Sequence, residues 1–261
     1  MRGKTKFWLI LATVLVLAGS MLFGGVMMTL QWKFSKLSTV PYHTVEHTVT
    51  PFERISIVAD TADVSFVPSK DGSYAVHCKE QQNAAHAVTV KDGTLMVELE
   101  RTRNWYENIG ISFTSPKITV ILPQKEYDAV SVTVTTGKVT IPDLTCTGDV
   151  SVSVTTGDVV LRDISCKNFA STGTTGNLTM KNAVAAERLS IQRTTGDIHL
   201  DSCDGAEVSV QTNTGNVKGT LRTEKRFITN TTTGKVNVPT STTGGKCQIR
   251  TTTGNIHLQV Q

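Results

Sequence analysis

A four-residue pattern, Thr or Asn followed by Thr-Gly and then Lys, Asp or Asn, recurs seven times in the second half of this chain. Consecutive glycines of this repeat are 19 or 20 residues apart. A fixed period of this length is typical of a solenoid, in which each coil of the chain stacks on another coil. The repeat glycines are Gly137, Gly157, Gly176, Gly196, Gly215, Gly234 and Gly254.

Apolar residues alternate on both sides of each repeat glycine. The position two residues after the glycine is always Val, Leu or Ile, and the position seven before it is Val, Leu, Phe or Cys. Alternate residues of a strand face the same way, so these positions line one interior. The alternation changes phase at the glycine, which reaches positive φ without steric cost, so we predict a corner there. The sequence therefore predicts an all-β fold, a single-stranded β-solenoid with coils of about 20 residues.

The N-terminal segment predicts a membrane helix. Residues 7–32 are free of charge and follow a short basic tail, residues 1–6. Such a helix would span about 39 Å, more than the ~30 Å hydrocarbon core. The alternative is a cleavable signal peptide ending near Ala18-Gly19-Ser20, but twelve more uncharged residues follow, which favours an uncleaved signal anchor. The basic N-terminus predicts a cytoplasmic tail (1–6), with the rest of the chain extracytoplasmic at the cell membrane.

The remaining chain divides by regularity. We expect a linker over residues 33–50, an irregular β-rich cap over 51–129 and the β-solenoid repeats over 130–261. Within the cap, residues 52–69 resemble a degenerate coil, with Thr61-Ala62-Asp63-Val64 in place of a corner. Terminal units of solenoids are usually atypical, so this irregular start fits a capping role.

Charge and motifs exclude several function classes. Residues 1–36 hold five basic residues and no acid, which leaves 21 of the 26 basic residues against all 22 acidic ones in the rest of the chain. Such a balance offers no basic field for nucleic acid. We find no catalytic, cofactor-binding or metal-binding motif. Lysine interrupts the column of calcium-type oxygens after the glycines, and His43 and His47 fall in the expected linker. We therefore expect a protein that is not an enzyme and has no cofactor.

The five cysteines fall into the columns of the repeat without a CxxC spacing. Cys146 and Cys166 both lie nine residues after their glycines and would stack in adjacent coils. Buried thiols that pack as small apolar groups and a Cys146–Cys166 disulfide both remain open interpretations.

Two segments are candidates for binding. The loop with Arg101, Arg103, Trp105 and Tyr106 combines the residue types that dominate binding hot spots. The final strand alternates as a good pairing strand with no cap behind it, so we expect it to dock onto a second copy or a partner strand. The strand residues concerned are Ile256, Leu258 and Val260.

The apolar helix, the segment FERISIVADTADVSFVPS and the train of TTG coils together resemble a known family. It is the bacterial "putative adhesin" family of β-strand-repeat proteins, whose function is unknown. The resemblance covers most of residues 45–261 and implies a right-handed β-solenoid on an exported or membrane-anchored protein. Some members of that family accompany envelope stress regulators of the phage-shock or lia type. It provides no catalytic residues to carry over.

These observations predict a non-enzymatic, membrane-anchored, extracytoplasmic module. We expect it to bind an envelope protein or cell-wall component, or to contribute to envelope stress signalling. A structural or adhesive surface rod is the alternative, and an enzyme is a distant third. Self-association through the C-terminal coil would fit either of the first two.

Overall fold

The computed structural model describes residues 2–32, 42–81, 85–100 and 115–261, which fall into two units. The first contains helix α1 (Arg2–Thr29), and the second contains the β-structure. Within α1, the 25 residues Thr5–Thr29 are long and apolar enough to cross a membrane. The predicted N-terminal apolar helix is therefore confirmed.

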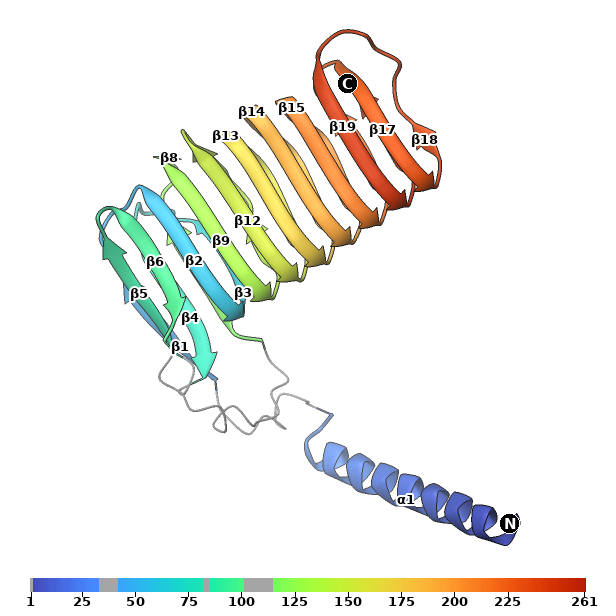
Figure 1. Cartoon of the computed structure of the whole chain (residues 1–261). Helices are drawn as coiled ribbons and strands as arrows, with labels where there is room; N and C mark the ends of the chain where they lie inside the picture. The colour runs from blue at the N-terminus through green and yellow to red at the C-terminus, as the bar shows by residue number, and fades with distance from the viewer. Residues whose placement is uncertain (1, 33–41, 82–84, 101–114) are drawn as a thin grey trace. The chain divides into compact units, whose positions relative to one another are not determined.

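The described part of the second unit is all-β, as predicted (Figure 1). Its strands are β1 (Tyr42–Thr48), β2 (Arg54–Thr61), β3 (Asp63–Pro68), β4 (Ala75–Gln81), β5 (His86–Lys91), β6 (Thr94–Leu99), β7 (Lys117–Leu122), β8 (Glu126–Tyr127), β9 (Ala129–Thr136), β10 (Val139–Ile141), β11 (Leu144–Cys146), β12 (Asp149–Thr156), β13 (Val159–Thr175), β14 (Leu178–Thr195), β15 (Ile198–Thr214), β16 (Val217–Leu221), β17 (Lys225–Thr233), β18 (Val236–Asn237), β19 (Gly245–Thr253) and β20 (Ile256–Val260).

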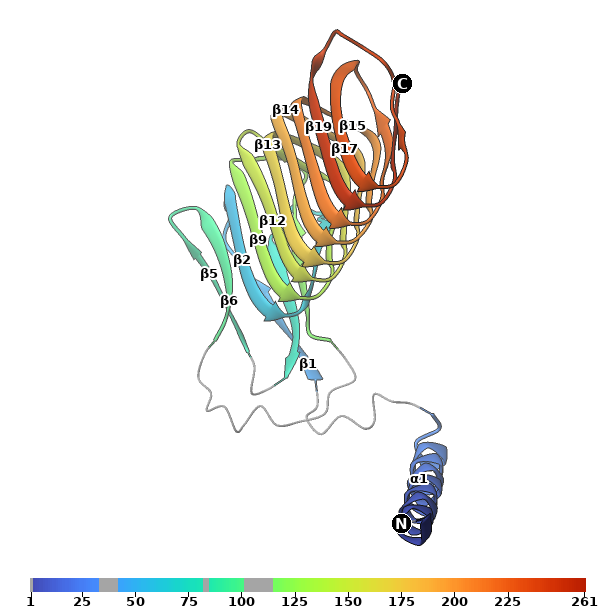
Figure 2. The same ribbon diagram turned by 45° about the vertical axis from the view of Figure 1, so that its right-hand side comes forward.

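The strands form two main rows of parallel neighbours, one on each side of the glycine corners (Figure 2). The first row runs β6-β2-β9-β12-β13-β14-β15-β19-β17. The second runs β7-β3-β10-β13-β14-β15-β16-β20-β18. Strands β13, β14 and β15 belong to both rows because each bends around a second corner.

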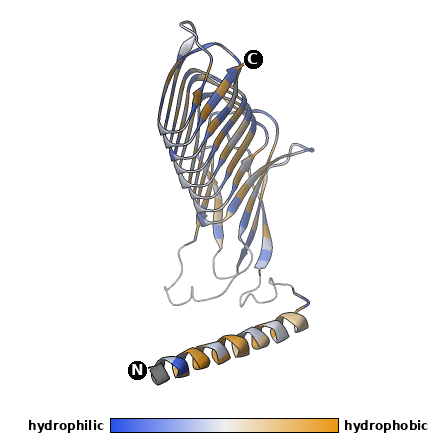
Figure 3. Cartoon of the chain, turned by 90° about the vertical axis from the view of Figure 1, so that its right-hand side faces the viewer, coloured by the Kyte–Doolittle hydropathy of each residue, from blue (hydrophilic) through white to orange (hydrophobic). Residues whose placement is uncertain are grey.

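Buried apolar columns fill the space between the rows. The column two residues after each glycine is fully buried from Val139 to Val217, and again at Ile256. Figure 3 shows the resulting alternation of apolar and polar residues along the strands. Val236 departs from the column, with 43% of its surface exposed. It lies on β18, whose only partner among the described strands is β20.

The residue after each corner glycine links adjacent coils. Where this residue is Asp or Asn, its side-chain oxygen accepts a backbone N–H from the same position of a neighbouring coil, and Asp63, which follows Ala62, does the same at the start of the stack. The bonds are Lys138 N to Asp63 Oδ1 (2.8 Å), Asn177 N to Asp158 Oδ1 (2.8 Å), Asp197 N to Asn177 Oδ1 (2.9 Å), Asn216 N to Asp197 Oδ1 (2.7 Å), Asn255 N to Asn216 Oδ1 (2.9 Å) and Lys235 N to Asn255 Oδ1 (2.8 Å).

Replacing one ladder residue tests the contribution of these bonds. Asp197 accepts both the backbone N–H of Asn216 (2.7 Å) and its side-chain Nδ2 (3.1 Å). We expect Asp197→Ala to lower the free energy of unfolding by about 1–2 kcal/mol, because the Asn216 donors lose their acceptor. Lys235→Ala is the matched control and should change it by less than about 0.5 kcal/mol, since its main-chain N–H is retained. Denaturant unfolding of both variants measures the difference, and equal effects would contradict it.

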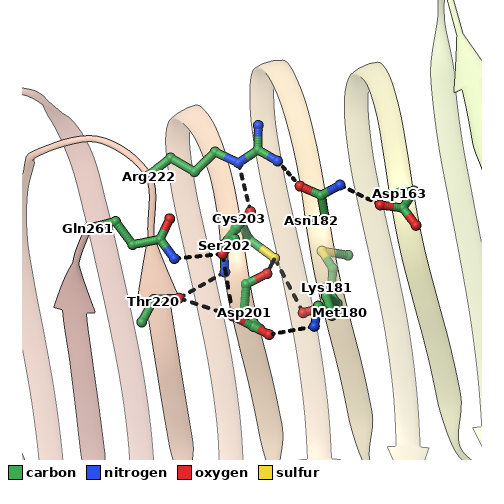
Figure 4. A network of polar contacts seen from close by, with 10 residues as sticks. All are labelled: Asp163, Met180, Lys181, Asn182, Asp201, Ser202, Cys203, Thr220, Arg222 and Gln261. Carbon is green, nitrogen blue, oxygen red and sulfur yellow. Dashed lines mark hydrogen bonds and ion pairs between the residues drawn. The ribbon is translucent and has the colours of Figure 1, made fainter.

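A second corner lies on the opposite side of the coil and uses polar residues with positive φ. Asp163, Asn182 and Ser202 have φ between 50 and 55°, values that Asn and Asp tolerate better than other non-glycine residues. Figure 4 shows the polar contacts around this corner. Asn182 donates to Asp163 and accepts from Arg222, whose Nε also donates to the Ser202 carbonyl at 2.9 Å. Polar side chains thus connect neighbouring coils at both corners.

The last two coils do not stack in sequence order. Strand β19 pairs with β15 on one side and with β17 on the other, and β20 lies between β16 and β18. Figure 1 shows β19 between β15 and β17. The chain therefore leaves a one-coil gap after β16, forms β17 and β18, and returns through residues 238–244 to fill it.

The start of the stack also differs from expectation. Residues 42–48 of the expected linker form β1, which pairs antiparallel with β4. Strands β2 and β3 lie inside the expected irregular cap, yet they pair in parallel with β9 and β10. Thr61 is paired with Thr136, so residues 54–68 form a true coil of the stack. The atypical part consists of the antiparallel pairs of β5 with β6 and of β4 with β1 and β7.

Candidate functional site

Of the two binding segments expected from the sequence, the structure describes only the second. Arg101, Arg103, Trp105 and Tyr106 lie outside the described residues. Ile256, Leu258 and Val260 lie on β20, which is flanked by β16 and, at Ile256 and His257, by β18. The final coil is not the end of the stack, because it enters the gap behind β17, whereas docking through this strand stays a prediction: Leu258 and Val260 pair with β16 alone among the described strands.

The open end is formed instead by β17 and β18, each with one partner strand among the described residues. Its inward positions are less apolar than those of other coils. Thr229 and Thr231 stand where β15 has Val210 and the buried Thr212. Polar residues on a terminal coil reduce the apolar surface available for edge-to-edge association.

The five cysteines are free thiols and all are buried. Burial raises the pKa of Cys146 and of Cys166 to about 12, with smaller contributions from Cys166 and Asp128 to the first and from Asp149 to the second. A thiol with such a pKa carries little thiolate at neutral pH and is a poor nucleophile. These two residues therefore pack as apolar groups in the described structure.

Three outward columns of the first row carry no charge over five adjacent strands, β9, β12, β13, β14 and β15, and a charged column with Asp149, Arg188 and Glu207 borders them. Three outward positions on each strand hold only Ser, Thr, Gln, Asn or Ala, in a chain in which 18% of residues are charged. We call this surface the hydroxyl face. It consists of Ser131, Thr133, Thr135, Ser151, Ser153, Thr155, Ala170, Thr172, Thr174, Ser190, Gln192, Thr194, Ser209, Gln211 and Asn213.

The hydroxyl face is hollowed at its centre. A shallow depression of about 410 Å³ extends over β12 to β15 and is lined by residues of the face together with Gly173 and Arg193. One hydroxyl, that of Thr172, donates to Ser153 Oγ at 3.1 Å. The amides of Gln192 and Gln211 are exposed and are register neighbours on β14 and β15. The surface thus offers donors and acceptors in rows that follow the spacing of the strands.

Arg193 lies beneath this depression with only 3% of its surface exposed. Its guanidinium donates to the Ser171 hydroxyl (3.1 Å) and to the carbonyls of Thr172 (3.3 Å) and Val154 (3.4 Å). Gly173 makes room for it, because a Cβ there would come within 3.0 Å of the guanidinium. Desolvation lowers the pKa of Arg193, but an arginine remains charged at neutral pH. Arg193 lies three residues before its repeat glycine. The equivalent residues Val134 and Val154 are also buried, so this position faces the interior.

The family model of Toastrack DUF4097 matches residues 52–261. The chain belongs to this family. The resemblance to "putative adhesin" β-repeat proteins is thereby confirmed. The search of curated proteins gives no match.

Several solved structures are similar to this toastrack chain. A "putative adhesin" from Bacteroides fragilis is 18% identical, with a TM-score of 0.58, over 84% of this chain and 97% of the other. A "putative cell adhesion protein" from Clostridium sporogenes is 12% identical, with a TM-score of 0.36, over 85% of this chain and all of the other. A "putative lipid binding protein" from Parabacteroides distasonis is 12% identical, with a TM-score of 0.31, over 86% and 98%. At these identities, the first shows a shared toastrack fold.

One buried cluster, in the atypical part of the toastrack, was not predicted from the sequence. Cys78 and Glu80 on β4 meet His86 at the start of β5, and all three are buried. Their spacing matches no known motif. The only available signal was the alternation that places Cys78 and Glu80 on the same side of a strand.

Proposed function

We propose that this protein is a non-enzymatic binding module, anchored in the membrane by α1, whose hydroxyl face binds a neutral polysaccharide of the cell envelope. The observation that carries the proposal is the uncharged surface over β9 to β15. Charged side chains keep an exposed sheet soluble. A broad exposed face without them is therefore more typical of a surface that binds a partner.

The chemistry of the face matches a sugar polymer. Hydroxyl and amide groups donate and accept hydrogen bonds without imposing a charge, as sugar hydroxyls do. A polysaccharide offers such groups repeatedly along its length, and the strands repeat theirs every ~4.8 Å. Each hydrogen bond between a side chain of the face and a sugar group is weak, so many of them along the polysaccharide are needed for useful affinity.

The acidic residues of the stack support a non-enzymatic role because they already have partners. Glu207 pairs with Arg188 (2.6 Å) and Lys246 (3.7 Å), and Asp201 pairs with Lys181 (3.5 Å). Carboxylates used in this way are poorly placed for acid–base catalysis of glycoside cleavage, which needs a pair facing one bond.

Binding to an envelope polysaccharide is a more specific form of the adhesive function, which is the alternative that the fold supports. The apolar length of α1 and the basic residues before it favour a single-pass anchor with the β-structure outside the cytoplasm. We place binding ahead of stress signalling, because the hydroxyl face supports binding whereas signalling follows only from the family resemblance.

A sedimentation assay with the detergent-solubilised full chain tests this function. The probes are insoluble chitin, a neutral polymer of N-acetylglucosamine, and purified peptidoglycan. We expect the wild type to sediment with at least one of them. Combining Gln192→Ala with Gln211→Ala should weaken binding by roughly 5- to 100-fold, because each lost hydrogen bond is worth about 0.5–1.5 kcal/mol.

The matched control removes two exposed charges from the other row, with Arg162→Ala and Lys181→Ala combined. This control should bind like the wild type. Wild-type protein that sediments with neither probe would refute the proposal. If the two double variants bound the probe equally, the polysaccharide would contact a surface other than the hydroxyl face.

A further inference from the structure

The residues Cys78, Glu80 and His86 form a compact group in the atypical first part of the stack. Cys78 and Glu80 are alternate residues of β4, so both side chains point to the interior. His86 begins β5, which pairs with β6 on the other row. The group therefore connects strands of the two rows from inside.

The geometry of the group is tight. One potential ligand atom from each residue lies within 4.8 Å of the other two. The exposed fractions of Cys78, Glu80 and His86 are 0%, 2% and 5%. Glu80 Oε2 lies 2.8 Å from His86 Nδ1 and accepts the His86 backbone N–H at 2.8 Å.

Burial makes this combination costly without a cation. A carboxylate removed from water needs a compensating charge, which either a protonated His86 or a bound metal ion can supply. The surrounding positions are apolar: Cys78 is flanked in register by Val45 on β1 and Ile118 on β7. In this apolar setting, a divalent cation would compensate the carboxylate and a thiolate together.

We propose that Cys78, Glu80 and His86 bind one Zn²⁺ ion that fastens β4 to β5. Thiolate sulfur, imidazole nitrogen and carboxylate oxygen are the three ligand types that zinc accepts in proteins. Calcium and magnesium prefer oxygen ligands alone, so the sulfur and nitrogen exclude them as the natural occupant.

The distances allow zinc with small side-chain shifts. Zinc bonds of about 2.0–2.3 Å in a tetrahedron place ligand atoms roughly 3.3–3.8 Å apart. Glu80 Oε2 and His86 Nδ1, which are 2.8 Å apart, would separate by about 0.5–1 Å, and Cys78 Sγ, within 4.8 Å of the other ligand atoms, would approach by about 1.5 Å at most. The fourth position falls to water.

The test uses the full chain in detergent micelles, without a polyhistidine tag, and Co²⁺ as a spectroscopic substitute for Zn²⁺. We expect one bound Co²⁺ per chain, with a thiolate-to-cobalt charge-transfer band in the near ultraviolet. Cys78→Ala should abolish this band. Cys247→Ala is the matched control, because Cys247 is also fully buried but lies outside the group, and it should keep the band.

A second variant guards against misfolding of the first. Glu80→Gln keeps an acceptor for the His86 N–H but removes the anionic ligand. It should lower the Zn²⁺ affinity, measured by competition with a chromophoric chelator, by more than the roughly 10- to 100-fold typical for loss of a second-shell partner. Zn²⁺ should also raise the wild-type melting temperature.

Three results would overturn the zinc site. They are wild-type protein that binds no Co²⁺, a charge-transfer band that survives in Cys78→Ala, and a Glu80→Gln variant with wild-type Zn²⁺ affinity. The first would leave the group as a hydrogen-bonded Glu80–His86 pair beside an inert thiol.

Discussion

Gly176→Ala is expected to destabilise the protein by about 3–5 kcal/mol. Gly176 has φ 131°, a value that is essentially confined to glycine. A Cβ at this position would also lie within 3.0 Å of the Gly157 carbonyl oxygen in the adjacent coil. That contact is to backbone, so the two coils would have to separate and weaken their hydrogen bonds. Denaturant unfolding of the variant measures the loss.

Gly72→Ala is the matched control for this prediction. Gly72 has φ 76° but nothing lies within 4 Å of an added Cβ. Backbone strain alone should then cost about 1–2 kcal/mol. If both variants lost the same stability, the close stacking of the corner glycines would not be what requires glycine.

Arg193→Glu is expected to cost about 3–5 kcal/mol at neutral pH, because it buries an anion that has no cationic partner. The guanidinium now donates to two carbonyls and a hydroxyl, and an ionised carboxylate can only accept. Gln192→Glu, one residue away on the exposed hydroxyl face, should change stability by less than about 0.5 kcal/mol. Thermal unfolding of the two variants gives the comparison.

The pH dependence of the Arg193→Glu variant separates buried charge from lost packing. Burial raises the pKa of an introduced carboxyl above its unfolded value of about 4.3, so the folded state binds more protons. The variant should then be least destabilised below about pH 4.3 and lose stability as pH rises through the folded pKa. A pH-independent loss relative to the wild type would mean that packing, and not charge, is responsible.

The regular part of the fold could be predicted because every coil has the same apolar columns and the same corner glycine. The columns through Val139 and Val150 specify which way every strand faces, and the glycine marks each corner. The order of the last coils could not be read in the same way. Phe227 and Cys247 occupy the same column, so either could pair with Val208 by pattern alone. The polar Thr229 was the one local sign of an end coil.

The buried group at Cys78 escaped prediction for a different reason. Its members come together because β4 pairs with β7, which is distant in sequence, while β5 forms a hairpin with β6. Local spacing contains no information about such pairings. The hydroxyl face lies between these cases: its columns were visible in sequence, but its freedom from charge across five strands becomes meaningful only when the register is known.

The insertion of β19 between β15 and β17 separates the order of synthesis from the order of assembly. Strands β17 and β18 leave the ribosome, or emerge from a translocation channel, before the strands that separate them from β15 and β16. If they stack at once, they occupy the place of β19 and β20 and must later be displaced. If they wait, they remain unpaired until residues 245–261 arrive. Maturation of the stack is therefore tied to the arrival of residues 245–261, and a chain stalled before them would expose a strand edge that the folded stack covers.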